Sequence, residues 1–394
     1  MKLNISRLFY GIVIAFLLLA IFSTVSPIVG AVFAILSLLF TLGIIPTAGN
    51  VLGANYAATA LAKAQPKLIQ KFASTELREI DPVTYKALRR SSEIMFPSHK
   101  VLRGREDRVI EAAYFNRTKR NLGSARNYNP SGVVGTSAVL TPSFSTYSDV
   151  FSLSMKQAGN NVFAYEEMMQ TAIENVLKNF SAGNETMAVN YIYNNRSSVN
   201  AGVADGTFNV VNNVFEITEA QSLNRVMQIT DTNMAENLYG GMALTVFCDS
   251  IAFNKFAFLS KQGESNATNT SFQFGGKTYI HSLALTAKAI ALGYSKGFWI
   301  TAADGTFGLL DWIPKENRET RDHGYAKWSM FKNPIDGCDY AVYNYGIAAD
   351  SSATGGYTQD WLDNIEFSID LAPEIAPTDI GGAGETVLQA FGLI

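Results

Sequence analysis

The side chains that most often carry catalysis or bind metals are sparse and scattered in this sequence. Its three histidines, His99, His281 and His323, share no metal-ligand spacing. The two cysteines, Cys248 and Cys338, are too few for a disulfide framework or a structural zinc site. The sequence contains no HExxH, no P-loop with its lysine and no GxSxG. We therefore predict that the protein is not an enzyme and that it has no cofactor and no metal site.

Three aspartates, Asp249, Asp304 and Asp311, are the remaining candidates for acid–base chemistry. They could act together only if the fold brought their carboxylates into one cluster. Asp249 stands directly before an amphipathic segment, which is typical of a helix cap. Asp304 precedes Gly305, and this dipeptide is typical of turns. We therefore expect structural roles for these carboxylates.

Other local motifs also favour structural roles. Gly275-Gly276-Lys277 lacks the spacing of a phosphate-binding loop and predicts a hairpin turn. Cys248 ends an apolar run that starts at Met242, so we expect it to be a small buried side chain. His281 ends a strand-like segment, so we expect its ring in the core or at an interface.

Charge is unevenly distributed along the chain. The net charge is −3, but residues 63–126 carry 15 basic and 7 acidic side chains, and residues 127–394 carry 14 basic and 27 acidic ones. The basic segment can face a polyanion or the acidic surface of another copy; a solvated surface is the third interpretation. Aromatic residues are few nearby, so any nucleic acid would be held by its backbone without sequence readout. The candidate residues are Lys86, Arg89, Arg90, Arg103, Arg105, Arg108, Arg117, Lys119, Arg120 and Arg126.

The start of the chain is strongly apolar. The first 62 residues contain two charged side chains, Lys2 and Arg7. Apolar sequence runs from Leu8 to Ile45 in two spans of about 18 residues that meet near Pro27, and each span has nearly the length needed to cross a bilayer. Basic residues flank both ends, which predicts a membrane hairpin with both ends in the cytoplasm. Two alternatives stay open: an unusually long signal peptide, and a segment buried in the final assembly.

Residues 51–100 have the composition of a helical, basic arm. Ala, Leu, Lys, Gln and Glu dominate the helix-prone part. Pro66 and Pro82 are expected to cut this arm into shorter helices. Asp81-Pro82 predicts the start of a helix that covers residues 83–94.

Residues 101–160 change to strand-like sequence. Segments 108–115 and 148–155 alternate between apolar and polar residues as strands do. Gly, Ser, Asn and Pro lie between them, so we expect the two segments to pair as a long excursion with a polar tip. A ribbon of this kind is marginally stable alone, so it requires a neighbour, which another copy could provide.

Residues 161–195 predict the longest helix. Its apolar positions approximate a helical stripe, and Ser181 to Gly183 is expected to interrupt it. The residues expected in its core are Phe163, Met168, Val176 and Phe180.

The last third of the chain is predominantly strand-like. The middle helices are separated along the sequence from these closing strands, which predicts an α+β fold and not a doubly wound parallel sheet. The expected strands cover residues 277–281, 297–301, 309–313, 340–345 and 365–371.

The order of these elements resembles the Hong Kong 97-type major capsid protein of tailed phages. That family has an N-arm, an extended loop, a spine helix, a peripheral domain and an axial domain in this order. Local sequence resembles the family too. The matching segments are Phe144 to Lys156, Glu166-Glu167 on a helix, Trp299-Ile300 in a strand, Asp311 to Pro314, and the late strand Asp363 to Ala372.

The resemblance implies a Hong Kong 97-type capsid fold, preceded in this chain by an apolar helical hairpin. Residues 1–50 would be the hairpin, which is a transmembrane candidate, and 51–100 the N-arm. Residues 101–160 would be the extended β-loop. Residues 161–394 would be the peripheral and axial body, with the spine helix at 161–195.

The resemblance also implies a function. The protein would be a structural subunit that self-assembles through hexamers and pentamers into an icosahedral phage shell enclosing DNA. Its further partners would be packaged DNA held by non-specific contacts, portal or accessory capsid proteins, and a membrane contacted through residues 8–45. It would reside in the virion after assembly in the host cytoplasm. Two alternatives stay open: an encapsulin-like cargo shell, which shares this fold, and a membrane-anchored cytoplasmic binding or scaffold protein.

Overall fold

The structure is a computed structural model of the whole chain. It describes residues 50–74, 81–96, 108–115, 137–154, 157–159, 161–196, 209–218, 230–231, 234, 243–260, 271–314, 321–323, 326–344, 348–349, 361–375 and 388–394. The predicted apolar hairpin lies outside these residues except for Asn50. Among the helices of the described ranges, none has the length and apolar character needed to cross a membrane.

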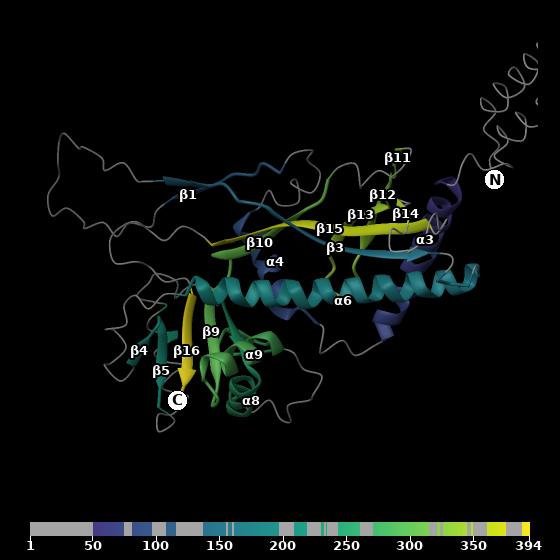
Figure 1. Cartoon of the computed structure of the whole chain (residues 1–394). Coiled ribbons are helices and arrows are strands. Elements are labelled where there is room, and N and C mark those ends of the chain that lie inside the picture. The colour runs from purple at the N-terminus through teal and green to yellow at the C-terminus, as the bar shows by residue number, and fades with distance from the viewer. Residues whose placement is uncertain are drawn as a thin grey trace, which may run out of the picture.

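The described helices and strands form a mixed α+β architecture, as predicted (Figure 1). The helices are α3 (Asn50–Ser74), α4 (Val83–Met95), α6 (Val162–Asn194), α8 (Ser250–Leu259) and α9 (Leu283–Leu292). The strands are β1 (Ala112–Phe115), β2 (Ser137–Leu140), β3 (Ser145–Ser154), β4 (Asn209–Val211), β5 (Val214–Ile217), β6 (Leu244–Cys248), β7 (Ser271–Phe274), β8 (Lys277–His281), β9 (Phe298–Ala303), β10 (Phe307–Trp312), β11 (Arg321–His323), β12 (Ala326–Lys332), β13 (Asp339–Asn344), β14 (Ala348–Ala349), β15 (Trp361–Ile375) and β16 (Leu388–Leu393).

The two prolines of the arm act differently. Helix α4 begins directly after Pro82, as predicted. Helix α3, in contrast, continues through Pro66, so the predicted break there is wrong. Ala60, Ala64 and Leu68 are buried at a spacing of four residues on one face of α3. This face packs in the hydrophobic cluster that also contains Met169 and Phe307, which we call the main core. Burial there offsets the loss of the backbone hydrogen bond that a proline removes from a helix.

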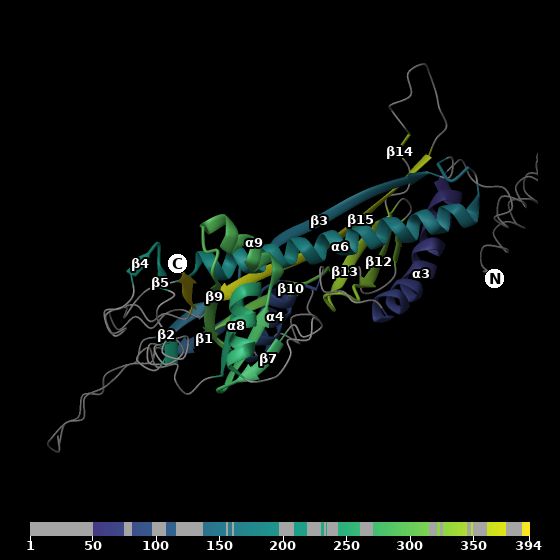
Figure 2. The ribbon, with the colours of Figure 1, turned by 90° about the horizontal axis from the view of Figure 1, so that it is seen from below.

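Helix α6 is one continuous element and lies along both β3 and β15 (Figures 1 and 2). Asn161 caps it by accepting a hydrogen bond from the backbone N–H of Phe163. The predicted interruption at residues 181–183 is wrong, because the Ser181 hydroxyl is buried and donates to the backbone oxygen of Leu177, one helical turn earlier. Tertiary packing therefore overrides the low helix propensity of Gly183.

The predicted core stripe of α6 is partly wrong. Val176 and Phe180 are buried, and Met168 is partly buried against the core, but Phe163 is 77% exposed. At about 100° per residue, Phe163 lies roughly a third of a turn away from the centre of the buried stripe. The observed stripe consists of Tyr165, Met169, Ile173, Val176, Leu177 and Phe180.

The first large sheet, which we call the long sheet, is built around β15. Strand β3 pairs with one edge of β15 from Ser145↔Leu371 to Ser154↔Leu362, and β10 and β13 share the other edge. Strands β12 and β11 continue the sheet beyond β13, and β14 pairs with β15.

The expected pairing of the 108–115 and 148–155 segments is also wrong. Strand β1 instead pairs with β2 as an antiparallel ribbon, with Phe115 opposite Ser137. Strand β3 joins the long sheet, where the ring of Phe151 stacks on that of Phe367 at a centroid distance of 6.2 Å. The ladder between β3 and β15 contains ten residue pairs, whereas the β1–β2 ladder contains four, so β15 offers β3 more backbone pairing.

The second large sheet, which we call the mixed sheet, has the strand order β4-β5-β16-β9-β6-β8-β7. It contains two parallel pairs, β16 with β5 and β6 with β8. Its β7–β8 hairpin turns at Gly275 and Gly276, whose φ angles are +58° and +76°. Glycine adopts such positive φ angles at little energetic cost. The turn predicted from the sequence is therefore confirmed.

The two faces of the mixed sheet are covered by different helices. Residues alternate along its strands: Phe298 and Ile300 of β9 pack in the main core with α6 and α9, and Trp299 packs in a second core with α8. Helices α8 and α9 therefore lie on opposite faces of this sheet. The chain ends at this sheet, after β16 (Figure 1).

Candidate functional site

The three candidate aspartates do not form a cluster. Asp249 accepts a hydrogen bond from the backbone N–H of Ala252 and caps α8, as predicted. Asp304 accepts a hydrogen bond from the Thr245 hydroxyl at 2.5 Å. Asp311 lies in β10 of the other sheet and faces Arg89. Within the described ranges, no group of three His, Cys, Asp or Glu side chains could hold a metal ion.

The other candidate side chains are bound within the fold. The His281 ring nitrogen lies 2.9 Å from the Ser250 hydroxyl. Cys248 is fully buried, as predicted, and Cys338 is also buried. Burial raises the pKa of both thiols well above the ordinary value, so neither forms a thiolate readily. His99 lies outside the described residues, and His323 lies in β11.

Three of the predicted basic residues contact carboxylates of their own chain. Lys86 pairs with Asp81 at 2.5 Å. Arg89 is mostly buried, lies 3.4 Å from Asp311, and donates a hydrogen bond to the backbone oxygen of Asp336.

The third is Arg108, which lies 3.1 Å from Asp370 and places its guanidinium 5.7 Å from the centroid of the Trp312 ring. Arg90 is exposed. The remaining predicted residues, which lie outside the described ranges, are Arg103, Arg105, Arg117, Lys119, Arg120 and Arg126.

A small cavity separates α4 from the mixed sheet. Its volume is about 230 Å³, and Lys86, Arg90 and Ile94 of α4 line one wall. Thr245, Thr278 and Asp304 are among the residues on the other side. Cations, carboxylates, hydroxyls and apolar side chains are mixed in this lining, so the composition does not select one class of ligand.

The most elaborate polar arrangement is a buried junction centred on Glu185 of α6. One carboxylate oxygen accepts hydrogen bonds from the backbone N–H groups of Thr84 at 2.9 Å and Tyr85 at 3.1 Å, in the first turn of α4. The other accepts a hydrogen bond from the Ser282 hydroxyl at 2.6 Å. Ser282 in turn caps α9 by accepting from the backbone N–H of Leu285. One side chain thus joins three helices.

The Glu185 carboxylate supplies the N-terminal cap that α4 lacks in its own sequence. Neither Pro82 nor Asp81 caps the helix, because Pro82 provides no side-chain hydrogen bond and the Asp81 carboxylate pairs with Lys86. A carboxylate at this position satisfies free N–H groups and interacts favourably with the helix dipole. Burial raises the pKa of Glu185, although the hydrogen bonds from Ser282 and Thr84 oppose this rise.

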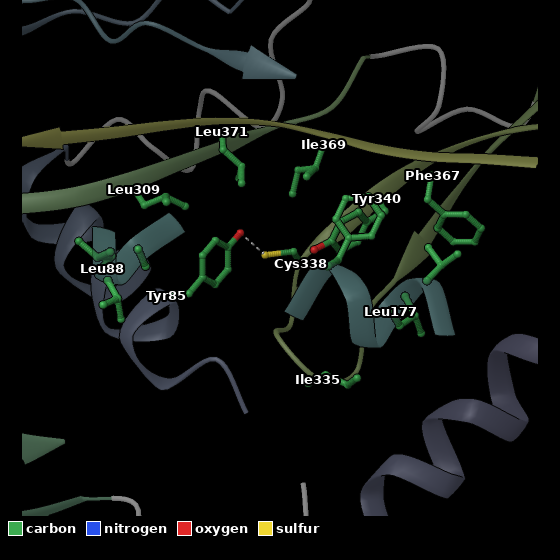
Figure 3. Packing of buried hydrophobic residues seen from close by; sticks show 14 of the residues in the cluster. Tyr85, Leu88, Leu177, Leu309, Ile335, Cys338, Tyr340, Phe367, Ile369 and Leu371 are labelled. Atoms are coloured by element: carbon green, nitrogen blue, oxygen red, sulfur yellow. Dashed lines mark hydrogen bonds between the residues drawn. The ribbon is translucent and has the colours of Figure 1, made fainter. Parts of the chain in front are cut away.

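A second buried cluster joins α4 and α6 to the long sheet. The Tyr85 hydroxyl lies 3.0 Å from the Cys338 sulfur, and both side chains sit among apolar residues (Figure 3). The Tyr340 hydroxyl donates to the Asp336 carboxylate at 2.6 Å and accepts from the Asn184 amide at 3.0 Å. Burial raises the pKa of Asp336. The two tyrosine rings and the sulfur are closed off from solvent, and their hydrogen bonds hold α4 and α6 against the long sheet.

Sequence reasoning missed these two junctions. Ser282 precedes the apolar run Leu283 to Leu292, which is a recognisable cap signal. Glu185 gives no such signal, because an acidic residue in a helix is ordinarily solvent-exposed. Its partners lie about a hundred residues away in the sequence, on either side.

The surface carries apolar side chains on several elements. The most exposed are Phe258 of α8, Phe163 of α6, Ile290 of α9, Val139 of β2 and Ile94 of α4. For a chain without a described catalytic cluster, these positions are the best candidates for contacts with other molecules.

Comparison with solved structures finds similarity to several phage structures. It is similar to a chain of the Cyanophage A-1(L) capsid asymmetric unit, with a TM-score of 0.47 and 10% identity over 79% of this chain and 92% of that chain. For the Cyanophage Pam1 capsid asymmetric unit the TM-score is 0.44, with 9% identity over 74% and 86% of the two chains. For a structure of Mycobacterium phage Che8 the corresponding values are 0.40, 8%, 76% and 90%. No protein-family model and no curated protein matches the sequence.

Proposed function

We propose that this chain is the repeating subunit of a closed protein shell of the tailed-phage type. The observation that carries the proposal is the combination of a 33-residue helix, α6, with a ribbon, β1–β2, that extends from the body (Figure 1). Among the described strands, β1 and β2 pair only with each other, and Val139 of β2 is 63% exposed. An isolated two-stranded ribbon is marginal in water, and packing against a neighbouring copy would stabilise it.

The interior of the subunit supports a structural role. Helix α4 belongs to the 51–100 arm, yet it is fastened to α6 and α9 through Glu185 and to β10 through Arg89 and Asp311. These contacts make the described part of the arm an integral part of the body. A rigid body with a projecting ribbon is suited to tiling, because each copy can present the same surfaces in the same orientation.

We also propose the partners expected from the sequence. Copies of the chain would form hexamers and pentamers, and packaged DNA would be held by non-specific contacts with the basic arm. Portal or accessory proteins would contact the completed shell. Exposed Arg90 is the described residue that fits a polyanion contact best, since a guanidinium binds phosphate bidentately.

Electron microscopy of the purified full chain, without detergent, tests the shell directly. We expect closed particles of uniform size. A monomer or small oligomer would overturn the proposal and favour a membrane-anchored scaffold.

The segment that connects β1 and β2 can be tested separately. Phe115 and Ser137 are register partners, so residues 116–136 can be replaced by a two-residue Asn-Gly turn that closes β1 and β2 as a hairpin. We expect a folded subunit that no longer forms particles. Particles of normal size and yield from this variant would show that residues 116–136 are not needed to join copies.

A further inference from the structure

Two short stretches of chain join the β1–β2 ribbon to the body. The first, residues 108–111, leads into β1, and we call it the incoming leg. The second, residues 141–144, leads from β2 into β3, and we call it the outgoing leg. The ribbon itself begins at the residue pair Ala112↔Leu140. The contacts of the two legs with the body therefore determine the direction in which the ribbon points.

The legs pack on the face of the long sheet that is turned away from α6. Residues alternate along β15: Ile369 and Leu371 belong to the main core with α6, whereas Ala372 belongs to a separate small core. We call this second cluster the ribbon-base core. It contains Ile110 of the incoming leg, Leu310, Trp312 and Ala372, and the side chains of Leu140 and Phe144 pack against it. Apolar contact thus reaches both legs.

Asp370 of β15 places a carboxylate beside this core. It is the register partner of Trp312 in β10 and of Thr146 in β3, so the three side chains lie in one row on the same face. Asp370 is 7% exposed. Its Oδ1 accepts a hydrogen bond from the Thr146 hydroxyl at 2.5 Å, and its Oδ2 accepts one from Nη1 of Arg108 at 3.1 Å. The Arg108 guanidinium also lies 5.7 Å from the centroid of the Trp312 ring.

The outgoing leg has a carboxylate contact of its own. Glu374, four residues after Asp370 in β15, accepts a hydrogen bond from the backbone N–H of Ser143 at 3.1 Å. One strand thus holds both legs, the incoming leg through Asp370 and the outgoing leg through Glu374. Because β15 is the strand around which the long sheet is built, the direction of the ribbon is tied to that sheet.

The charged contact adds what apolar packing does not provide. Apolar contacts are non-directional, so the ribbon-base core alone would allow the incoming leg to slide or tilt. A nearly buried carboxylate costs free energy unless it is paired, and an apolar side chain at position 370 would pack beside Trp312 without that cost. A paired charge inside an apolar contact selects one register out of several.

We propose that the Arg108–Asp370 pair fixes the angle at which the ribbon leaves the body, and that this angle sets the size of the shell. The inference rests on the proposed function, in which the ribbon joins copies. A ribbon held at one angle reaches the neighbouring copy at the same place in every subunit, as a closed symmetric assembly requires. Without the pair, the ribbon keeps its apolar base but its angle varies.

Distances between two spin labels test the angle in the full-length protein. Val139→Cys on β2 and Ile290→Cys on α9 provide the labelling sites, because both positions are exposed, whereas the two native cysteines are buried and stay unlabelled. Labelled chains are mixed with an excess of unlabelled chains, so that only distances within one chain are measured. We expect one narrow distance distribution, which broadens in Arg108→Gln and in Asp370→Asn. The double variant should be no broader than either single variant, since all three lose the same pair.

Electron microscopy of the same variants tests the effect on the shell. We expect Arg108→Gln and Asp370→Asn to lose uniform particles in favour of particles of mixed size and open shells. The Arg108 side chain is half-exposed, so the unfolding temperature of Arg108→Gln should stay close to that of the unaltered protein. Glu366→Gln is the matched control, since Glu366 lies four residues before Asp370 in β15, opposite Val150 of β3 and away from the ribbon base. It should change neither the distance distribution nor the particle size.

The outcomes separate this inference from the shell proposal. Unchanged distance distributions in both single variants would overturn the inference, because apolar packing alone would then fix the angle. Broadened distributions with uniform particles of normal size would also overturn it, since the angle would then not set the shell size. If the unaltered protein forms no particles, the shell proposal fails together with the statement on shell size, whereas the distance measurement still decides whether the pair fixes the angle.

Discussion

The Glu185 carboxylate of α6 and the Ser282 hydroxyl at the start of α9 are 2.6 Å apart, in the interior of the subunit. Through this pair, the helix that lies along the long sheet is joined to a helix of the mixed sheet. The same carboxylate caps α4, so the positions of three helices depend on one side chain. This relationship makes Glu185 the most informative residue for testing how the subunit keeps its shape.

Removal of the Glu185 side chain should destabilise the subunit strongly. Glu185→Ala leaves two backbone N–H groups of α4 and the Ser282 hydroxyl without their acceptor. Since each unpaired buried donor costs about 1–3 kcal/mol, we expect a loss of about 3–5 kcal/mol in the free energy of unfolding, measured by chemical denaturation. Glu167→Ala on the exposed side of α6 is the control and should change it by less than about 0.5 kcal/mol. Equal effects of the two substitutions would contradict the assigned role.

The stability contributed by Glu185 should depend on pH. Burial raises its pKa above the ordinary value of 4.5. As the pH rises past 4.5, the unfolded chain releases this proton before the folded chain does, so the free energy of unfolding falls until the pH exceeds the folded-state pKa.

Comparison with Glu185→Gln isolates this effect, because other titrating groups are common to both proteins. The difference in unfolding free energy, unaltered protein minus variant, should decrease as the pH rises above 4.5, until the pH exceeds the raised folded-state pKa of Glu185. It is measured by denaturation at several pH values in one buffer series. A difference that increases with pH over this range would mean that the hydrogen bonds outweigh burial and that the folded-state pKa is lowered.

The two phenylalanines of the predicted α6 stripe should behave differently. Phe180 is buried, with its ring centroid 4.6 Å from that of Tyr340, and Phe163 is exposed. We expect Phe180→Ala to cost about 3–5 kcal/mol of unfolding free energy and Phe163→Ala less than about 0.5 kcal/mol. Thermal and chemical unfolding of the two variants checks this. Similar costs at both positions would place Phe163 in a core that the structure does not show.

Two glycines make a second matched pair. A Cβ atom on Gly308 of β10 would lie 2.9 Å from the Cα of Ser92 in α4, so Gly308→Ala should push α4 away from the long sheet and cost about 1–3 kcal/mol. A Cβ atom on Gly183 would meet nothing within 4 Å in the interior of α6. Gly183→Ala should therefore stabilise the subunit by about 0.5–1 kcal/mol. Denaturation curves with opposite shifts are the expected result, and shifts of the same sign would contradict the close approach of α4 to β10.

Local patterns predicted local structure well. The β7–β8 turn followed from Gly275-Gly276, and the start of α8 followed from Asp249, because each depends on residues adjacent in the sequence. The α+β class followed from the order of helices and strands.

Contacts between distant segments could not be predicted in the same way. The pairing of β3 with β15 joins positions more than 200 residues apart, and the choice between this partner and β1 depends on the whole sheet. The continuity of α3 through Pro66 depends likewise on packing in the main core. The Glu185 junction is the hardest of these contacts to predict from sequence. A buried carboxylate is stable only when it has hydrogen-bond donors, and here they come from α4 and from the start of α9, both distant in the sequence.

Substitution of the adjacent residues Arg89 and Arg90 of α4 should have different effects, because Arg89 stabilises the fold and Arg90 is a candidate for contact with a polyanion. Arg89 pairs with the nearly buried Asp311 and donates to the backbone oxygen of Asp336, so Arg89→Gln breaks a buried ion pair and should cost about 3 kcal/mol of unfolding free energy. Arg90 is exposed, so Arg90→Gln should leave stability within about 0.5 kcal/mol. If Arg90 faces packaged nucleic acid, its substitution should lower nucleic-acid retention in purified particles and weaken the dependence of retention on salt concentration. Unchanged retention and unchanged particle stability for Arg90→Gln would identify Arg90 as part of a solvated surface.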